Sequence, residues 1–266
     1  MKKYLFTLLF LSFQLSAQTL CQRLQEGVVP YLEEASSRIH FKNQGGLMNG
    51  GVCWWHNRLQ RASAYLVEFK PEMPAAGQQQ VEKILADLKR MKKVVVIPGF
   101  KNFDSFTQAH QKEVQKLLEG WQKEDGFLNQ QWARGISGKY ELEPKAMQER
   151  MNSLYQQFLD SPHPVWVMAQ IKGISSHAFL ILDMVPVGKG YEVKVIDSNY
   201  PTQTKSFTYV YGQKFLKHPK DKYSFIPYLG FQKDFDVILA SVKDYCGEIL
   251  NFNAKDIPKG QIEVGR

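Results

Sequence analysis

Apolar residues in the first part of the chain recur at the spacing of amphipathic helices. The repeat that begins at Cys53 continues through Trp55, Leu59, Ala62, Leu66 and Phe69, as in a helix with one buried side. We expect this helix to end near residue 70, because the residue before Pro71 resists the α conformation. Similar spacing predicts a helix over 19–38, interrupted by Pro30, and further helices over 78–93, 104–123 and 143–159. A short buried strand is predicted over residues 94–97.

The pattern changes beyond residue 160 to short runs rich in β-branched and aromatic residues. Strands are predicted over residues 165–171, 178–185, 191–196, 206–211 and 225–231, with glycine turns at 173 and 188–190 between the first three. A last helix is expected over residues 234–249. Helices followed by an antiparallel meander indicate an α+β fold of two lobes, a helical lobe of about residues 18–160 and a β lobe of about residues 161–266.

The first 17 residues have the pattern of a secretory signal peptide. Lys2 and Lys3 precede an apolar run over residues 4–13, which is too short to span a bilayer, and Ala17 is a small residue suited to cleavage. We therefore expect an exported protein, periplasmic or secreted, in which residues 18–266 form one domain. No integral membrane segment is expected after cleavage.

The composition is that of a packed globular protein, with 44% hydrophobic and 23% charged residues among 266. The formal charge of +8 falls to +6 when cleavage removes Lys2 and Lys3. The basic residues are spread along the chain, as at 89–93 and 214–222, which favours a solvated surface over an anionic partner. No nucleic-acid-binding motif is present, so no nucleic-acid partner is expected.

Three cysteines are an odd number for an exported protein. Cys21 and Cys246 lie near the two ends of the chain, and chain ends are often close in space. A disulfide between them would suit an oxidising compartment and would leave Cys53 as the single free thiol. The sequence leaves this pairing open.

Cys53 stands where a predicted helix follows a glycine-rich loop, in the stretch FKNQGGLMNGGVCWW at residues 41–55. A helix N-terminus favours negative charge and offers unpaired N–H groups. Both properties suit a thiolate nucleophile and an oxyanion that forms beside it. The loop glycines let backbone and substrate approach closely. The alternative interpretation is a small buried apolar residue, the commonest role of a lone cysteine.

A histidine and an aspartate occupy matching places on the two predicted strands that flank Gly188. His177 opens one strand in SSHAFLILD, and Asp197 closes the next in VIDSNYP. Because the turn makes these strands antiparallel neighbours, the start of one lies beside the end of the other. The carboxylate can then hold the imidazole in one tautomer. Cys53, His177 and Asp197 therefore form a candidate nucleophile, base and orienting group.

The stretch FKNQG, followed by Cys53 and Trp54, resembles the active-site opening of papain-like cysteine peptidases. In that family a Gln in an N-Q-G context precedes a C-W pair that begins the long central helix. His177 lies 124 residues after Cys53 and Asp197 lies 144 after it, close to the family spacing of about 130–150 residues. An aspartate as third member fits bacterial branches. The resemblance covers three short segments.

The resemblance implies a papain-like two-lobe fold, with a helical lobe and its central Cys-bearing helix packed against an antiparallel β lobe. It implies Cys53 as nucleophile, His177 as base, Asp197 as orienting group and Gln44 as the oxyanion-hole side chain. Gln44 lies nine positions before Cys53, compared with the family's usual six, so Asn49 is a rival oxyanion donor.

Together these residues predict an exported thiol hydrolase that cleaves amide bonds through an acyl-enzyme intermediate, with peptide or protein as substrate. A cell-wall amidase and a transglutaminase-like acyl transferase would use the same triad. A non-catalytic binding protein on the same fold is the alternative from another class. No cofactor is expected. A metal site built on Cys53, His56 and His177 is disfavoured because no further ligand pair supports it.

Overall fold

The computed structural model describes residues 19–46, 51–125, 141–161, 164–171, 176–218, 223–228 and 233–250. The expected signal peptide and Asn49 lie outside these residues. The helices are α1 (Leu20–Glu26), α2 (Val28–Glu33), α3 (Cys53–Leu66), α4 (Gln78–Arg90), α5 (Phe103–Ala109), α6 (Gln111–Lys123), α7 (Pro144–Asp160) and α8 (Lys233–Leu250), with a 3-10 turn, η1 (Ala35–Ser37), after α2. The strands are β1 (Val67–Lys70), β2 (Val95–Pro98), β3 (Val165–Gln170), β4 (Ser176–Pro186), β5 (Gly190–Asp197), β6 (Thr204–Val210), β7 (Leu216–Lys217) and β8 (Ser224–Tyr228). The α+β class expected from the sequence is confirmed.

The helix that carries Cys53 ends at Leu66, so the expected end near residue 70 is wrong. The next four residues form β1, which pairs in parallel with β2, with Val67 opposite Val95 and Phe69 opposite Ile97. Val67 and Phe69 are both buried, and β-branched and aromatic side chains favour the extended backbone. Their spacing from Leu66 fits a helix and a strand equally well, so periodicity alone could not separate the two.

Two other predicted helices are broken at positions that the apolar pattern did not mark. The first divides at Gly27, whose φ of +103° is accessible to glycine, whereas Pro30 lies inside α2. The predicted helix over 104–123 divides into α5 and α6 at His110. Asn102 caps α5 by accepting a 2.9 Å hydrogen bond from the Ser105 N–H.

The main sheet has the strand order β6-β5-β4-β3-β8-β7, and every neighbouring pair in it is antiparallel. The expected meander is therefore confirmed for β3 to β6. The predicted turn at residues 188–190 joins β4 to β5, where a side chain on Gly190 would collide with the Tyr209 carbonyl oxygen, 1.8 Å from the position of a Cβ. Glycine at this position lets the β5–β6 pair close tightly.

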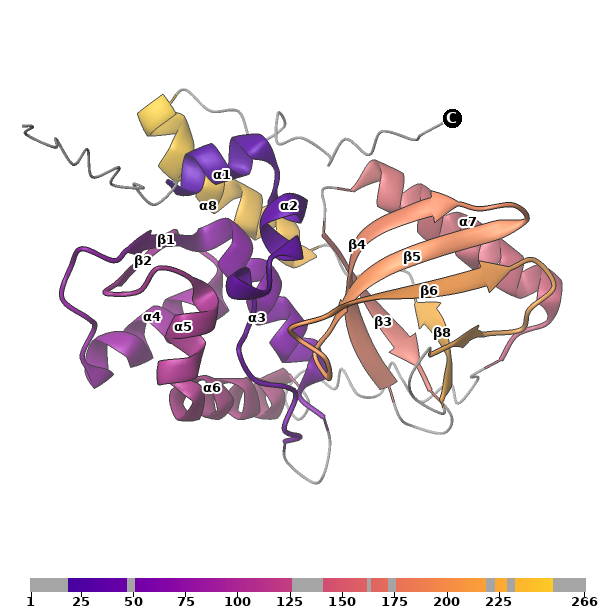
Figure 1. Cartoon of the computed structure of the whole chain (residues 1–266), viewed down its shortest axis with the longest axis horizontal. Helices are drawn as coiled ribbons and strands as arrows, with labels where there is room; N and C mark the ends of the chain where they lie inside the picture. Colours follow the sequence, from indigo (N-terminus) through magenta and orange to yellow (C-terminus); the bar gives the residue numbers. More distant parts are fainter. Residues whose placement is uncertain are drawn as a thin grey trace, which may run out of the picture.

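Two hydrophobic clusters hold the elements together, one on each face of the sheet. The first surrounds α3, includes residues of α1, α4, α6 and α8, and takes Trp166 and Leu180 from the sheet. The second lies between the opposite face and α7, where Met147 and Phe158 pack with Phe179. Figure 1 shows α7 beside the sheet and α8 among the N-terminal helices. The packing of these two helices thus crosses the lobe boundary expected at residue 160.

The two ends of the described chain are joined covalently. Cys21 of α1 and Cys246 of α8 form a disulfide with their Cα atoms 5.7 Å apart, although 225 positions separate them in the sequence. The pairing that the sequence left open is therefore present, and Cys53 remains a free thiol.

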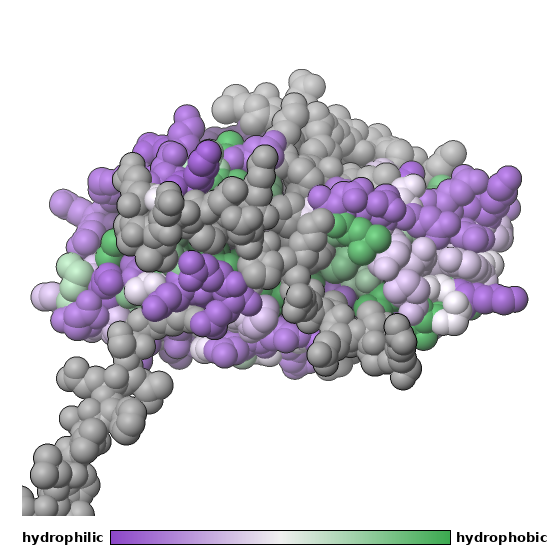
Figure 2. All heavy atoms as spheres, turned by 90° about the horizontal axis from the view of Figure 1, so that it is seen from above, coloured by the Kyte–Doolittle hydropathy of each residue, from purple (hydrophilic) through white to green (hydrophobic). Residues whose placement is uncertain are grey.

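Hydrophilic residues cover most of the described surface seen in Figure 2, and the apolar areas between them are small. This distribution agrees with the enclosure of the large apolar side chains in the two clusters. Among the described helices, none has both the length and the apolar character needed to span a bilayer.

Candidate active site

Cys53 is the first residue of α3, the helix around which the larger hydrophobic cluster is built. Thirteen of the 14 residues of α3 are buried, so neighbouring elements enclose the helix on all sides. Val52 is the N-cap and provides no side-chain hydrogen bond to the helix. The N–H groups of a first helical turn have no partner within the helix and favour a nearby anion. The Cys53 side chain is itself enclosed, with 3% of the residue exposed.

His177 and Asp197 meet as the hairpin pattern predicts. His177 is the second residue of β4 and Asp197 is the last residue of β5, where it pairs directly with Phe179. Because alternate residues of a strand share a face, His177 and Phe179 lie on the same side, and Asp197 faces His177 diagonally. Nε2 of His177 lies 2.7 Å from Asp197 Oδ1.

The Cys53 thiol lies next to the His177 ring and is the third member of the candidate triad. The Cys53 side chain acts on the His177 ring through its charge and a side-chain hydrogen bond, both of which raise the pKa of the ring. Asp197 takes Nε2, which leaves Nδ1 as the ring nitrogen available to the sulfur. The structure therefore brings together the three residues that the sequence identified, although 144 positions separate the first from the last.

Electrostatics in this enclosed site favour a charged imidazole. Burial alone would lower the pKa of His177, but the Cys53 side chain and the hydrogen bond to Asp197 outweigh burial and raise that pKa to about 10. Burial likewise opposes ionisation of Asp197, and hydrogen bonds from His177, His218 and the Asn199 N–H outweigh it, so the pKa of this carboxyl lies well below its usual value. At neutral pH an imidazolium therefore lies between the sulfur and a carboxylate.

Asn57 fixes the distance between α3 and β4. It lies one helical turn after Cys53 and is fully buried. Its Nδ2 donates to the Cys53 carbonyl oxygen at 3.1 Å and to the Ala178 carbonyl oxygen at 2.7 Å. One amide group thus ties the turn that carries the sulfur to the residue that follows His177. No sequence pattern pointed to this role, because Asn57 is one of several polar residues between the apolar positions of the helix.

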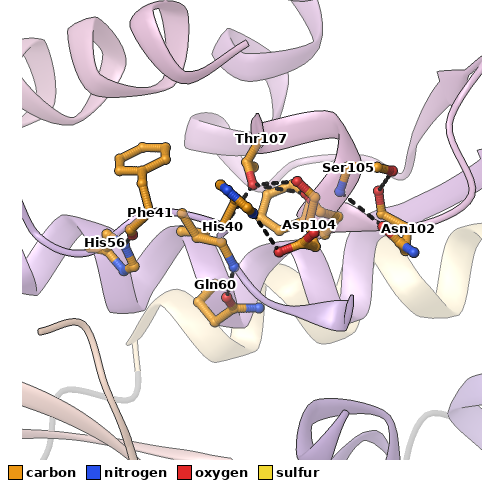
Figure 3. A network of polar contacts seen from close by, with 10 residues as sticks. His40, Phe41, His56, Gln60, Asn102, Asp104, Ser105 and Thr107 are labelled. Carbon is orange, nitrogen blue, oxygen red and sulfur yellow. Dashed lines mark hydrogen bonds and ion pairs between the residues drawn. The ribbon is translucent and has the colours of Figure 1, made fainter. Parts of the chain in front are cut away.

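The segment that leads into the glycine loop is held between α3 and α5 (Figure 3). On the α3 side, Gln60 accepts from the Ile39 N–H at 2.7 Å, and His56 Nε2 donates to the Phe41 carbonyl oxygen at 3.1 Å. On the α5 side, the His40 N–H donates to Thr107 Oγ1 at 2.9 Å. These bonds give the loop a fixed starting point beside Cys53.

Among the described loop residues, Asn43 has a side chain that is held by several hydrogen bonds. Its Oδ1 accepts hydrogen bonds from the N–H groups of Gly45 and Val52, both at 3.1 Å. Only the carbonyl end of an amide can accept two such bonds, so the amide orientation is defined. Its nitrogen then lies 3.3 Å from Asn199 Oδ1, and its backbone N–H donates to the Ser198 carbonyl oxygen at 2.7 Å.

The amide nitrogen of Asn43 borders the same space as the sulfur. A Cβ on Gly51 would lie 3.1 Å from Asn43 Nδ2 and 3.8 Å from Cys53 Sγ, so this glycine keeps the space between them open. Gln44, by contrast, is exposed and borders a hollow against α6, and the described contacts do not bring it to the sulfur. The rival donor, Asn49, lies outside the described residues.

His56 is close to the site but is not a candidate acid or base. Burial, as the largest cause, lowers its pKa to about 4, so the ring is neutral at physiological pH. Its Nε2 donates to Phe41, which prevents this nitrogen from reaching a metal. The described residues contain no group of His, Cys, Asp and Glu arranged to bind a metal ion.

His218 is a site residue that the sequence analysis missed. Its Nε2 lies 3.2 Å from Asp197 Oδ2, the carboxylate oxygen that His177 does not use. It follows the two-residue strand β7, which the sequence did not predict, so no pattern placed it near Asp197. With it, the site consists of a thiol, two imidazoles, a shared carboxylate and an oriented amide.

Comparisons of the chain with protein-family models, with curated proteins and with solved structures give no match. The chemistry of the site therefore rests on its own residues. A thiol beside a charged imidazole, with an oriented carboxylate and nearby N–H donors, has the parts required for attack on a carbonyl carbon.

Proposed function

We propose that this protein is an exported cysteine hydrolase of papain-like two-lobe architecture that cleaves amide bonds, with peptide or protein as substrate. The observation that supports the proposal is the hydrogen-bonded series from the Cys53 thiol through His177 to Asp197. A nucleophile, a base and an orienting carboxylate in this order are the arrangement that nucleophilic acyl transfer requires.

In the proposed reaction, the Cys53 thiolate attacks the carbonyl carbon of the substrate amide. The carbonyl oxygen of the amide then becomes an oxyanion. The C–N bond then breaks, and the His177 imidazolium gives its proton to the leaving amine. A water molecule attacks the resulting thioester while His177 accepts a proton from it. The acid product leaves, and the thiolate and imidazolium are restored. Throughout the reaction, the Asp197 carboxylate accepts the hydrogen bond from His177 Nε2–H. This bond holds the His177 ring with Nδ1 towards the sulfur.

In this proposal Asn43, together with the Cys53 N–H, stabilises the oxyanion. Its Oδ1 is already held by two backbone donors, and one N–H of its amide nitrogen is donated to Asn199 Oδ1, so the second N–H of that nitrogen can donate to the oxyanion. A donor of fixed orientation is effective because it does not have to reorganise when charge develops. Asn43 thus takes the role that the resemblance assigned to Gln44.

Labelling and turnover test the proposal together. Wild type, Cys53→Ser and His177→Ala would be treated with iodoacetamide at pH 6, the modified residue located by mass spectrometry, and cleavage of casein followed in parallel. We expect a single fast modification at Cys53, since the other two cysteines are paired. Loss of His177 should slow both reactions by about two orders of magnitude or more.

His110→Gln is the matched control, because His110 packs against Phe100 and Phe106 and has no proposed role; it should behave as wild type. If wild type is modified no faster than His177→Ala, the catalytic proposal is lost.

The alternative activities differ in their products. A peptidase would release new amino termini from casein, a cell-wall amidase would release fragments from peptidoglycan, and an acyl transferase would form ammonia and an amine adduct from a glutamine peptide. Fast labelling without any product would favour a binding protein.

A further inference from the structure

Asp197 is shared by two histidines that approach its two oxygens. Oδ1 accepts from His177 Nε2 at 2.7 Å and from the Asn199 N–H at 2.8 Å. Oδ2 lies 3.2 Å from His218 Nε2. Because Asp197 is ionised, both imidazoles donate to it. Neither Asp197 nor the His218 side chain is accessible to solvent, so water does not replace these bonds.

The His218 ring is held by contacts that do not depend on the carboxylate. It stacks on Tyr223, with 4.9 Å between ring centroids and 28° between planes, and on Tyr200, at 5.9 Å and 20°. Its backbone N–H donates to the Tyr223 carbonyl oxygen at 3.2 Å. The ring thus presents Nε2 to Asp197 from a fixed position.

We infer that His218 is a positioning residue of the active site, which fixes the plane of the Asp197 carboxylate and through it the ring of His177. The inference rests on the proposed function. With Oδ2 anchored, the carboxylate cannot turn about its Cβ–Cγ bond without breaking the bond to His218. Oδ1 then stays directed at His177 Nε2, and Nδ1 stays directed at the sulfur.

The surroundings of His218 and Asp197 indicate that His218 positions the carboxylate and does not act as a second proton-transfer group. Among the described residues, the groups with charges or protons near His218 include Asp197, the hydroxyls of Tyr200 and Tyr223, and Lys205, whose Nζ lies 4.6 Å from the Tyr200 ring centroid. Asp197 and the His177 ring lie between His218 and the sulfur. His218 therefore acts on the reaction through Asp197, without touching the reacting atoms.

Two substitutions separate the hydrogen bond from the packing. His218→Phe keeps an aromatic ring for the tyrosines but removes the donor, whereas His218→Gln keeps an N–H donor and removes the ring. We expect His218→Phe to lower kcat by about tenfold or more, the usual scale for an outer hydrogen-bond partner, with KM little changed. His218→Gln should recover part of that loss. Phe225→Leu, in the same aromatic cluster, controls for destabilisation alone.

The rate of iodoacetamide modification at Cys53 gives a readout that needs no substrate. If His218→Phe slows this modification but wild type hydrolyses no amide, the positioning inference stands and the proposed function fails. If wild type hydrolyses amides and folded His218→Phe matches it in kcat and modification rate, the inference fails and the function stands. A folded His218→Gln that is no better than His218→Phe also overturns the inference.

A measurement on the unaltered protein tests the same geometry if the variants do not fold. In a nitrogen-resolved NMR spectrum, His218 should show a proton on Nε2 that exchanges slowly with solvent, because it is donated to a buried carboxylate. A ring protonated on Nδ1 alone, or a rapidly exchanging Nε2 proton, overturns the inference.

Discussion

Asn43 and Gln44 are adjacent in the sequence but lie in different surroundings. Asn43 is tied to Gly45, Val52 and the Asn199 side chain beside the sulfur, whereas Gln44 is exposed against α6. A motif match cannot distinguish such neighbours, because it gives the spacing of residues along the chain but not the direction of their side chains.

Substituting each of the two in turn tests which one acts on the oxyanion. Asn43→Ala should lower kcat by about 10²–10³-fold, the loss seen when one oxyanion-hole donor is removed, while Gln44→Ala should leave kcat within about twofold. Steady-state kinetics on one peptide substrate provide the comparison. A larger loss for Gln44→Ala would restore the role implied by the family resemblance.

The raised pKa of His177 predicts how the stability of the fold depends on pH. An imidazole whose pKa is about 10 in the fold and about 6.5 in the unfolded chain stabilises the fold fully below pH 6.5. This contribution is lost as the pH rises through about 10. The difference in unfolding free energy between wild type and His177→Gln should therefore be larger at pH 6 than at pH 10.

Urea unfolding at pH 6, 8 and 10 measures this difference. His110→Gln removes a ring that packs against Phe100 and Phe106 and is the control for the loss of a packed imidazole. A His177→Gln difference that is constant from pH 6 to pH 10 would mean that His177 is not charged in the folded protein.

At the scale of elements, the alignment of α3 with β4 depends on Asn57. Replacing it with aspartate would place a buried negative charge against the carbonyl oxygens of Cys53 and Ala178. The expected loss of stability is about 3–5 kcal/mol, the cost of an unpaired buried charge. Asn57→Ala should cost about 1–3 kcal/mol, because it leaves those oxygens without their donor.

Gln60→Ala is the matched control for Asn57→Ala, since Gln60 lies on the same helix and also makes two buried hydrogen bonds, to Ile39 and Ser37. Both variants should lose similar stability in urea, but only Asn57→Ala should slow iodoacetamide modification of Cys53 in the folded state. Equal modification rates would show that α3 and β4 stay aligned without Asn57.

The β4–β5 hairpin could be predicted because all of its information is local. The glycine turn, the alternating strands and the two polar residues at their ends lie within about 20 positions, and their pairing follows from the turn. The end of α3 could not be predicted in this way. Residues 67–70 are a strand only because β2, almost 30 positions later, provides hydrogen bonds for them.

At the scale of the whole molecule, periodicity showed which faces are apolar but not what each face packs against. The apolar faces of α7 and α8 were visible in the sequence, yet α7 packs on the sheet and α8 packs against α3. The same limit explains why His218 was missed, since its partner is an aspartate 21 positions away across a short, unpredicted strand.

The Cys21–Cys246 disulfide closes a loop that spans almost the whole chain. Replacing both cysteines with serine should lower the unfolding free energy by about 2–5 kcal/mol, because a long closed loop restricts the unfolded chain most. For a protein of this size the loss corresponds to a decrease in Tm of about 5–15 °C. Calorimetry of the variant and of reduced wild type should agree.

Modification of Cys53 serves as the control for that experiment. Because the disulfide does not contact the site residues, the folded double variant should react with iodoacetamide at the wild-type rate. An unchanged Tm would indicate that the noncovalent packing of α1 and α8 is sufficient to hold the ends together.

Because α8 packs against α3, its late position in the sequence determines when α3 becomes enclosed during synthesis. The ring of Phe235 packs against Tyr65 with 5.1 Å between centroids, and Asp234 accepts from Arg58 at 2.7 Å, so the last helix shields the one that carries the sulfur. A ribosome that has just translated β8 has already made the thiol, both imidazoles and the carboxylate. The nascent chain still lacks α8 at that point, so α3 becomes fully enclosed only after this helix has been made.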